Sequence, residues 1–272
     1  MARDPETSPT RAGEARLALV TGGNGGIGLE FARLLARDGF ALILVARDAV
    51  RLEAAAAELR AGGAGAVSIR AADLADPAAV AQLCREVERL ELDVLVNNAG
   101  FGAYGPFVDA DEALALAMIA TNIAALTALT RAALPGMVAR GQGRIVQVAS
   151  TAAFAPGPFA AVYAASKAYV LSFSEALSEE LSETRIAVTA LCPGPTHTGF
   201  AARAGMGATR VFRAQVADAA AVAQAGYRAM LAGKRVEVVG PANRLMTFAV
   251  RLLPRGLIAR VSRRAYSTTP EI

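Results

Sequence analysis

Short runs of apolar residues alternate with longer amphipathic stretches along this 272-residue chain. Runs as uniformly apolar as these are typical of strands covered on both faces, as in a parallel sheet. The longer stretches repeat their apolar residues at helical spacing. We expect strands at residues 16–20, 41–45, 66–71, 93–96, 144–148, 186–191 and 236–239. We expect helices at residues 27–38, 50–61, 77–90, 111–140, 160–182 and 219–232.

The regular order of strand and helix indicates how the sheet is wound. Parallel neighbours in one sheet are joined by right-handed crossovers that usually contain a helix. The pattern therefore predicts an α/β fold with a doubly wound, mostly parallel, Rossmann-like sheet of about seven strands flanked by helices. No shift in composition marks a linker, so we expect a single domain at 15–240, after a disordered N-terminal tail at 1–14 and before a C-terminal extension at 241–272.

Composition excludes several classes of protein. The formal charge of +4 and the pI of about 9.4 are mildly basic, but no basic patch is interleaved with aromatic residues. We therefore expect no nucleic-acid partner. Two distant cysteines, Cys84 and Cys192, suit a reducing compartment and have no zinc-site spacing, so we expect no metal. We expect neither a signal peptide nor a membrane span, and hence a cytoplasmic protein that is at most peripheral to a membrane.

A glycine-rich turn follows the first predicted strand, at an edge of the sheet where ligands of such folds bind. Residues 21–28 are Thr-Gly-Gly-Asn-Gly-Gly-Ile-Gly, and a helical pattern starts at once. Glycine lets the backbone approach a pyrophosphate, and a helix N-terminus offers it free N–H groups. A glycine-rich run alone can be a flexible loop, but its position between strand and helix favours a dinucleotide site.

The end of the second predicted strand bears on which dinucleotide binds. A protein that binds NAD usually carries a carboxylate here, which accepts a hydrogen bond from the ribose 2′-hydroxyl. Arg47 stands at this place, and a guanidinium can pair with a 2′-phosphate instead. Arg47 therefore favours NADP(H) over NAD(H), although it can also be a solvated strand-end arginine, and Asp48 is an awkward neighbour for a phosphate.

Tyr163 and Lys167 stand four residues apart in a helical pattern, so both project from one face. A cation ~4 Å from a phenol interacts with the phenolate by roughly 4 kcal/mol at an effective dielectric constant of about 20, which lowers a pKa by about three units. We therefore expect the pKa of Tyr163 to fall from its usual value near 10 toward neutrality, where acid–base catalysis is efficient. Taken alone, this pair is also common on solvated helix faces.

Further residues place the pair in a recognisable setting. Ser150 ends the fifth predicted strand 13 residues before Tyr163, Asn122 lies in the long predicted helix, and Asn97-Asn98-Ala99-Gly100 follows the fourth strand. With the T-G-x-x-x-G-I-G turn, these motifs make the chain resemble the short-chain dehydrogenase/reductase family, common single-domain type, over roughly residues 15 to 240. In combination the motifs are highly specific.

The resemblance implies that Asn122, Ser150, Tyr163 and Lys167 are the catalytic residues. It also implies that Asp73-Leu74 lies against the adenine, that Asn97 is structural and that the segment from Pro193 contacts the nicotinamide. The implied cofactor-binding set is Gly22, Asn24, Gly26, Ile27, Gly28, Arg47, Asp73, Leu74, Asn98, Ala99, Gly100, Tyr163, Lys167, Pro193, Gly194, Thr196 and Thr198. Taken alone, Asp73 can also be the N-cap of the next helix.

The function implied is hydride transfer between NADP(H) and a carbonyl or secondary alcohol, with Tyr163 as general acid/base. Ser150 would stabilise the developing charge, and a Lys167–Asn122 relay, in which Asn122 holds a water, would resupply the proton. A small-residue-rich, apolar loop at 195–215 resembles the family's mobile substrate lid and suggests an apolar substrate. His197 is expected to be an ordinary exposed histidine, and Cys192 a small core residue.

Other interpretations stay open. The chain can be an NAD(H)-dependent alcohol dehydrogenase of the same family or a non-catalytic dinucleotide-sensing protein, although a sensor would predict a damaged catalytic set. A nucleotide-sugar epimerase or dehydratase typically has a longer C-terminal domain and a different glycine spacing. Family relatives commonly pair through the helices that carry Asn122 and Tyr163, so we expect a homodimer or homotetramer.

The C-terminal extension is the least family-like part of the chain. Between Arg244 and Arg264 there are six arginines and no acidic residue, alternating with apolar side chains. Pro254 and Gly256 are expected to divide it into two short helices. It can be a tail packed on its own or a partner subunit. It can also make peripheral membrane contact through residues 243–265, because a basic amphipathic segment suits anionic headgroups.

Overall fold

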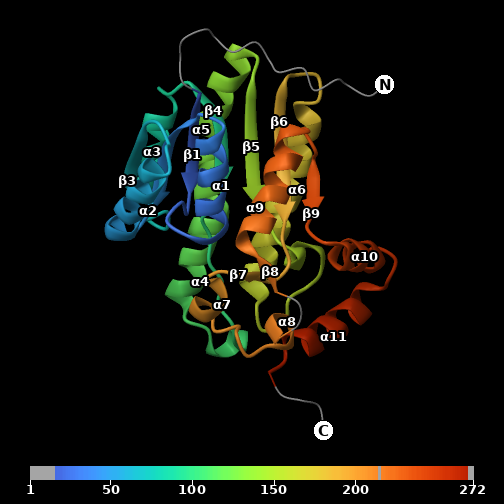
Figure 1. The fold of residues 1–272 in the computed structure, drawn as a ribbon. Coiled ribbons are helices and arrows are strands. Elements are labelled where there is room, and N and C mark those ends of the chain that lie inside the picture. Colours follow the sequence, from blue (N-terminus) through green and yellow to red (C-terminus); the bar gives the residue numbers. More distant parts are fainter. Residues whose placement is uncertain (1–15, 214–215, 269–272) are drawn as a thin grey trace.

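The computed structural model describes residues 16–213 and 216–268, so the tail predicted at 1–14 lies outside the described residues. Seven parallel strands form the central sheet in the order β3-β2-β1-β4-β5-β6-β9 (Figure 1). These strands are β1 (Leu17–Thr21), β2 (Ala41–Ala46), β3 (Val67–Ala71), β4 (Leu92–Asn97), β5 (Gly143–Val148), β6 (Ile186–Cys192) and β9 (Val236–Val238). Each predicted strand is found to within one residue, and the doubly wound parallel sheet is confirmed.

Helices cover both faces of this sheet, with α1 and α9 in front of it in Figure 1. The long helices are α1 (Gly26–Arg37), α2 (Ala49–Ala61), α3 (Pro77–Val87), α4 (Glu112–Ile119), α5 (Leu126–Arg140), α6 (Ala161–Glu180) and α9 (Ala219–Leu231). Short elements are η1 (Phe107–Asp109), η2 (Ala120–Ala125), η3 (Thr151–Phe154), β7 (Thr196–His197), α7 (Phe200–Arg203), α8 (Arg210–Arg213) and β8 (Ala217–Asp218). Two further helices, α10 (Pro241–Val250) and α11 (Arg255–Tyr266), follow the sheet.

Alternate residues of the central strands β1, β2 and β4 enter two different cores. In β1, Val20 packs with residues of α1, α2 and α9, whereas Leu19 packs with residues of α3 and α5 on the other face. Both side chains are fully buried. This is the reason for the uniformly apolar strands, since a strand buried on both faces has no position for a solvated side chain.

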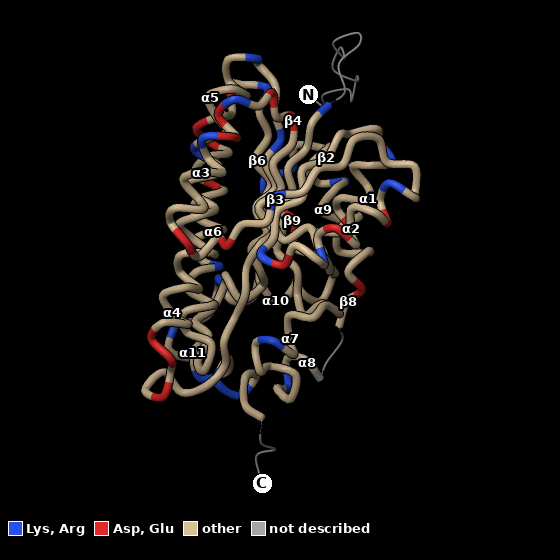
Figure 2. The backbone as a smooth tube through the Cα atoms, turned by 90° about the vertical axis from the view of Figure 1, so that its left-hand side faces the viewer, with Lys and Arg blue, Asp and Glu red and all other residues tan. Residues whose placement is uncertain are grey.

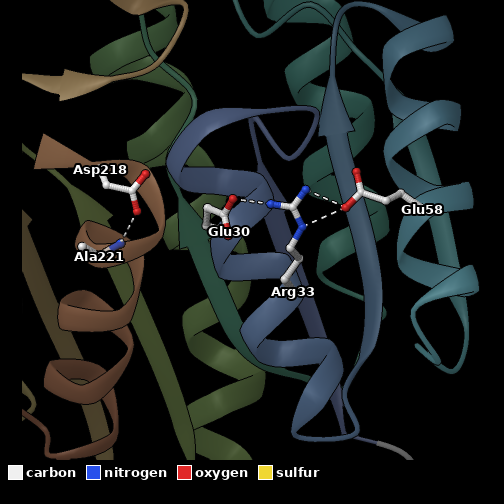
Figure 3. A network of polar contacts seen from close by, with 5 residues as sticks. All are labelled: Glu30, Arg33, Glu58, Asp218 and Ala221. Carbon is white, nitrogen blue, oxygen red and sulfur yellow. Dashed lines mark hydrogen bonds and ion pairs between the residues drawn. The ribbon is translucent and has the colours of Figure 1, made fainter.

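Aspartates set where several helices begin. Asp48, Asp76, Asp111 and Asp218 each accept a hydrogen bond from a backbone N–H in the first turn of α2, α3, α4 and α9. Such caps satisfy donors that have no partner inside the helix. Figure 3 shows the cap at Asp218, and beside it Arg33 of α1, which contacts Glu30 of the same helix and Glu58 of α2.

The stretch predicted as one helix at 111–140 is continuous but not uniform, because the π-helical turn η2 lies between α4 and α5. The stretch Glu112–Arg140 is also long and apolar enough to cross a membrane, since an 18-residue window within it has a mean hydropathy of 1.8. Residues 113–130 carry no charge, so the expectation that the sequence offers no such segment is wrong. Its apolar character has a structural cause in the fold, since Leu129 and Met137 are fully buried in the core beside the sheet.

Candidate active site

The strand order reverses at β1, whose neighbours are β2 and β4. The glycine turn follows β1 and leads into α1, whose N-cap, Gly25, supplies no side-chain hydrogen bond. Gly22 has φ +64° and lies where a Cβ would be 2.6 Å from Asn98 Nδ2. A Cβ on Gly28 would be 2.4 Å from the carbonyl oxygen of Gly22. Only glycine lets the turn and the helix approach this closely.

Hydrogen bonds join the glycine turn to the segment after β4. Thr21 Oγ1 accepts from the backbone N–H of Asn98 (3.0 Å) and of Ala99 (2.9 Å). Asn98 Nδ2 donates to the carbonyl oxygens of Thr21 (2.9 Å) and Gly22 (3.2 Å). Asn97 is buried and donates to Thr130 Oγ1 at 3.0 Å, a structural contact as the resemblance implies. The amide of Asn98 therefore holds the shape of the turn.

Three arginines from three elements gather at one end of the cavity. Arg47 follows β2, Arg51 lies in the first turn of α2, and Arg203 ends α7; all line the cavity. The pKa of Arg203 is lowered by burial and by the nearby positive charges of Arg51 and Arg47. Asp48 accepts from the backbone N–H of Arg51 at 3.0 Å, so its carboxylate serves as a helix cap.

Asp73 and Leu74 also line the cavity. Asp73 Oδ1 accepts from the backbone N–H of Ala75 at 2.9 Å. Asp76, and not Asp73, is the N-cap of α3. The alternative that Asp73 caps this helix is therefore wrong.

Ser150, Tyr163 and Lys167 meet at the other end of the cavity. Ser150 lies just after β5, and its side chain is near enough to Tyr163 to lower the pKa of that phenol. Lys167 comes one helical turn after Tyr163 in α6 and donates from Nζ to the carbonyl oxygen of Val148 at 2.7 Å. Its Nζ lies 5.9 Å from the centre of the Tyr163 ring. One helix and one strand end thus supply the three polar groups.

Burial dominates the titration of this pair. It raises the pKa of Tyr163 to about 12, although the nearby Ser150 side chain acts in the opposite direction. It lowers the pKa of Lys167 to about 8. The expected fall of the Tyr163 pKa toward neutrality is therefore wrong for the protein's own groups. Burial removes water from the phenolate and so destabilises it. The ammonium of Lys167, which is directed at a backbone carbonyl, does not stabilise the phenolate enough to offset this loss.

Asn122 does not line the cavity. It lies in η2, is 1% exposed, and exchanges two hydrogen bonds with the backbone of Phe101 (3.1 and 3.0 Å). Its Nδ2 also donates to Ser166 Oγ at 3.0 Å. The side chain expected to hold a relay water is thus occupied in fixing the loop after β4 against α6.

The segment after β6 is more ordered than the loop predicted at 195–215, of which residues 214–215 lie outside the described part. Thr196 is buried, donates from Oγ1 to the carbonyl oxygen of Gly194 at 2.9 Å, and belongs to β7, which pairs with β8. Thr198 Oγ1 accepts from the backbone N–H of Phe200 at 3.2 Å. His197 is exposed, as expected.

Aromatic and apolar side chains close the cavity around Tyr163. The Phe200 ring lies 5.2 Å from the Tyr163 ring, and Met206 and Phe212 belong to the same apolar cluster. Tyr266, at the end of α11, joins them, and its carbonyl oxygen accepts a hydrogen bond from the hydroxyl of Tyr104 at 2.6 Å. The C-terminal extension therefore contributes part of the wall.

A single cavity of about 380 Å³ contains most of the implied residues. Those that line it are Gly22, Asn24, Gly26, Ile27, Arg47, Asp73, Leu74, Asn98, Ala99, Gly100, Ser150, Tyr163, Lys167, Pro193, Gly194, Thr196 and Thr198. Gly28 and Asn122 are the exceptions, and both act through packing or hydrogen bonds on the lining residues.

Sequence reasoning missed Arg51, Arg203 and Tyr266. Arg51 stands four residues after Arg47, a spacing that could have indicated a second basic group near the same place. Arg203 lies in the loop predicted as the substrate lid, but nothing in the sequence directs it toward Arg47. Nothing local to Tyr266 places it in the cavity, because α11 reaches the cavity through tertiary folding.

Comparison with known proteins agrees with this geometry. The short chain dehydrogenase family model matches residues 16–208. The chain belongs to the short-chain dehydrogenase/reductase family. It is 30% identical over 241 residues to the ketoacyl reductase HetN of Nostoc, covering 88% of this chain and 83% of that protein.

Solved structures of the family superimpose on most of the chain. A short-chain dehydrogenase from Sphingobium yanoikuyae in complex with NADPH has a TM-score of 0.80 and 34% identity, covering 90% of this chain and 95% of that one. The bulky-bulky ketone specific alcohol dehydrogenase from Comamonas testosteroni has a TM-score of 0.75 and 28% identity, covering 90% and 94%. The chain is thus a short-chain dehydrogenase/reductase, an oxidoreductase acting on ketones or alcohols.

The cysteines of this family member lie apart from the reacting groups. Cys192 is fully buried at the end of β6, and burial raises the pKa of its thiol to about 12, so it is a core residue as expected. Cys84 is half-buried on α3. Among residues 16–213 and 216–268, no group of three or more histidine, cysteine or acidic side chains could hold a metal ion.

Proposed function

We propose that this chain transfers hydride between NADP(H) and an apolar ketone or the matching secondary alcohol, with Tyr163 as the proton-transfer residue. One observation carries the proposal. Ser150, Tyr163 and the buried Lys167 line the same cavity that begins at the glycine turn. This arrangement supports carbonyl reduction, which needs a proton donor, a polarising hydroxyl and a cation close together.

The residues around the turn fit a phosphorylated nicotinamide dinucleotide. Gly22 and Gly28 carry no side chain, so a ligand can approach the backbone there. The start of α1 beside them has no side-chain cap, and such a helix N-terminus suits a pyrophosphate. Arg47, with Arg51 and Arg203 beside it, offers positive charge where the adenosine ribose would lie. This charge supports NADP(H) over NAD(H), and the NADPH complex of the Sphingobium yanoikuyae enzyme is consistent with it.

When bound, the dinucleotide supplies or accepts the hydride. For reduction, Ser150 would donate a hydrogen bond to the substrate carbonyl oxygen and stabilise its developing negative charge. Tyr163 would give its phenolic proton to that oxygen as the carbon gains hydride, which completes the alcohol. Lys167 would then return a proton toward Tyr163. Because the side chain of Asn122 is engaged with Phe101, it would support this transfer by fixing the loop after β4 beside Lys167.

The apolar wall supports a bulky, apolar substrate body. Phe200, Met206, Phe212 and Tyr266 surround the approach to Tyr163 with carbon surface. The names of the Comamonas testosteroni enzyme, specific for bulky ketones, and of the Nostoc ketoacyl reductase point to the same chemical class. We therefore propose a ketone flanked by two sizeable groups.

The variant Tyr163→Phe tests the proposal. Removing the hydroxyl leaves the ring packed against Phe200, so folding and cofactor binding should persist. We expect kcat for ketone reduction to fall by about 10²- to 10⁴-fold, the usual contribution of a general acid. NADPH binding, followed by its fluorescence, should persist, because most of the residues implied to hold the cofactor lie at the glycine turn and the arginine end of the cavity.

Tyr169→Phe is the matched control. Tyr169 lies on the same helix, and its hydroxyl bonds to Thr127 Oγ1 at 2.9 Å, away from the cavity. It should keep full turnover. Near-normal ketone reduction by Tyr163→Phe would overturn the assignment.

Assembly and location stay predictions. Leu114, Leu116 and Ile119 of α4 and Tyr169 of α6 are exposed, which supports pairing through these helices into a homodimer or homotetramer. We likewise keep the prediction of a cytoplasmic enzyme.

A further inference from the structure

The outer face of α10 carries apolar side chains where a surface helix normally carries polar ones. Leu245 and Phe248 of α10, and Leu252 in the turn after it, follow one another at i, i+3 and i+7, and are 70%, 60% and 72% exposed. The inner face holds Thr247, which is buried, and Asn243, which donates from Nδ2 to the carbonyl oxygen of Val239 at 2.7 Å. This helix therefore turns its apolar stripe away from its own protein.

Exposed apolar side chains continue beyond α10 into α11. Ile258 fixes α11 to the protein as its buried residue. Leu257 and Val261, one turn apart, are 46% and 54% exposed, and Leu253 between the two helices is 46% exposed. We name the exposed apolar set the tail surface: it consists of Leu245, Phe248, Leu252, Leu253, Leu257 and Val261.

Positive charge accompanies the tail surface. Residues 241–268 contain six arginines and no acidic residue. Arg255 and Arg260 are exposed and have no hydrogen bond or ion pair within the part of the chain that the structure describes. Blue segments lie beside α11 at the lower end of the molecule in Figure 2, and Figure 1 shows α10 and α11 outside the sheet and its helices.

The tail surface borders the substrate end of the cavity. Tyr266 is the last residue of α11 and lines the cavity. Helix α11 packs against α8, which lies in the loop predicted as the substrate lid. Arg251 lies 6.0 Å from the ring of Phe154, in the short helix that follows Ser150. A surface that held α10 and α11 would therefore lie next to the place where an apolar substrate enters.

We propose that the tail surface docks on the headgroup region of an anionic lipid bilayer. Exposed leucines and phenylalanine can enter the boundary between headgroups and acyl chains, while arginines meet the anionic lipid. A second copy of the chain fits less well, because a two-fold contact would place this arginine-rich surface against itself. The inference concerns binding to a surface and does not depend on which ketone is reduced.

Co-sedimentation of the full chain with vesicles tests the proposal. The wild-type protein should pellet with vesicles of phosphatidylcholine mixed with phosphatidylglycerol, and much less with phosphatidylcholine alone. Leu245→Asp/Phe248→Asp should abolish pelleting. Arg255→Gln/Arg260→Gln should weaken it about thirtyfold, since each surface arginine contributes about fivefold to binding.

Matched controls lie elsewhere on the protein. Val138→Asp changes an exposed apolar residue of α5, and Arg85→Gln/Arg89→Gln removes two exposed charges near the end of α3. Both should bind vesicles like the wild type.

All variants should reduce a water-soluble ketone at the wild-type rate, which separates this inference from the proposed function. Failure of the wild type to pellet, or equal pelleting of all variants, would overturn the proposal. The proposal would also be overturned if the wild type did not bind vesicles and Leu245→Asp/Phe248→Asp dissociated an oligomer. The tail surface would then join two copies of the chain.

Discussion

At the scale of single residues, burial acts on Tyr163 and Lys167 in opposite directions. It raises the pKa of Tyr163 to about 12 and lowers that of Lys167 to about 8. At neutral pH the phenol is therefore protonated, which is the form that donates to a carbonyl. Lys167 is the group of the pair that changes charge first as the pH rises.

This order predicts opposite pH profiles for the two directions of the reaction. Reduction needs the phenolic proton of Tyr163 and the ammonium proton of Lys167. Its kcat/KM should therefore be level below pH about 8 and fall about tenfold per pH unit above it. Oxidation needs a proton acceptor, so its kcat/KM should rise to the same pH and then level off. Initial rates in both directions from neutral to alkaline pH measure this. Lys167→Arg should remove the change in kcat/KM near pH 8 in both directions, because arginine does not titrate there. Parallel profiles in the two directions would contradict the prediction.

The same residues show what a sequence can and cannot predict at this scale. Helical spacing correctly brought Tyr163 and Lys167 together, because residues four apart share a helix face. The family resemblance correctly added Ser150, which lines the same cavity. The direction of the Tyr163 pKa shift could not be predicted, since it depends on burial by side chains such as Phe200, which arrives from a different segment. For Asn122 the sequence indicated a buried polar residue, but its partner, the backbone of Phe101, is set by tertiary structure.

At the scale of elements, the arginine group depends on three of them. The end of β2 supplies Arg47, α2 supplies Arg51 and α7 supplies Arg203. A hydrogen bond to a charged group contributes about 1.5–3 kcal/mol, so Arg47→Ala should lower kcat/KM for NADPH by about 10- to 100-fold. NADH carries no 2′-phosphate, and its kcat/KM should change less than about threefold.

Steady-state rates with both cofactors measure this selectivity. Arg51→Ala should act in the same direction, and Arg89→Ala, on the exposed surface, should have no effect. An equal loss with NADPH and NADH after Arg47→Ala would support the NAD(H) alternative.

Element boundaries were predictable where a local cause exists. Aspartate caps at Asp76 and Asp218 place helix starts, and buried runs place strands. The π-helical turn η2 and the short strands β7 and β8 were not predictable. Each depends on contacts made across the fold, such as the pairing of Thr196 with Ala217.

At the scale of the whole molecule, the wall of the cavity joins distant parts of the chain. Tyr266 near the C-terminus meets Tyr104 from the loop after β4. Tyr266→Ala removes part of the apolar wall, so KM for a bulky apolar ketone should rise about tenfold, in line with about 1.5–3 kcal/mol for burying a large side chain. A small ketone, which contacts less of the wall, should change less.

Tyr104→Phe is the companion variant, because it removes the hydrogen bond to Tyr266 but keeps the ring. It should give a smaller rise in KM than Tyr266→Ala. Identical effects of Tyr266→Ala on large and small ketones would show that the residue supports folding and does not contact substrate. Thermal unfolding of both variants separates these outcomes.

The position of Tyr266 also gives the enzyme an order of assembly during its synthesis. Chains fold progressively as they leave the ribosome, N-terminal parts first. The glycine turn, Arg47 and Arg203 all precede Tyr266 in the chain, Arg203 by more than sixty residues. The residues at the dinucleotide end of the cavity are therefore synthesised before Tyr266 is available to complete the apolar wall. That wall is complete only once α11 has been made and has packed against α8.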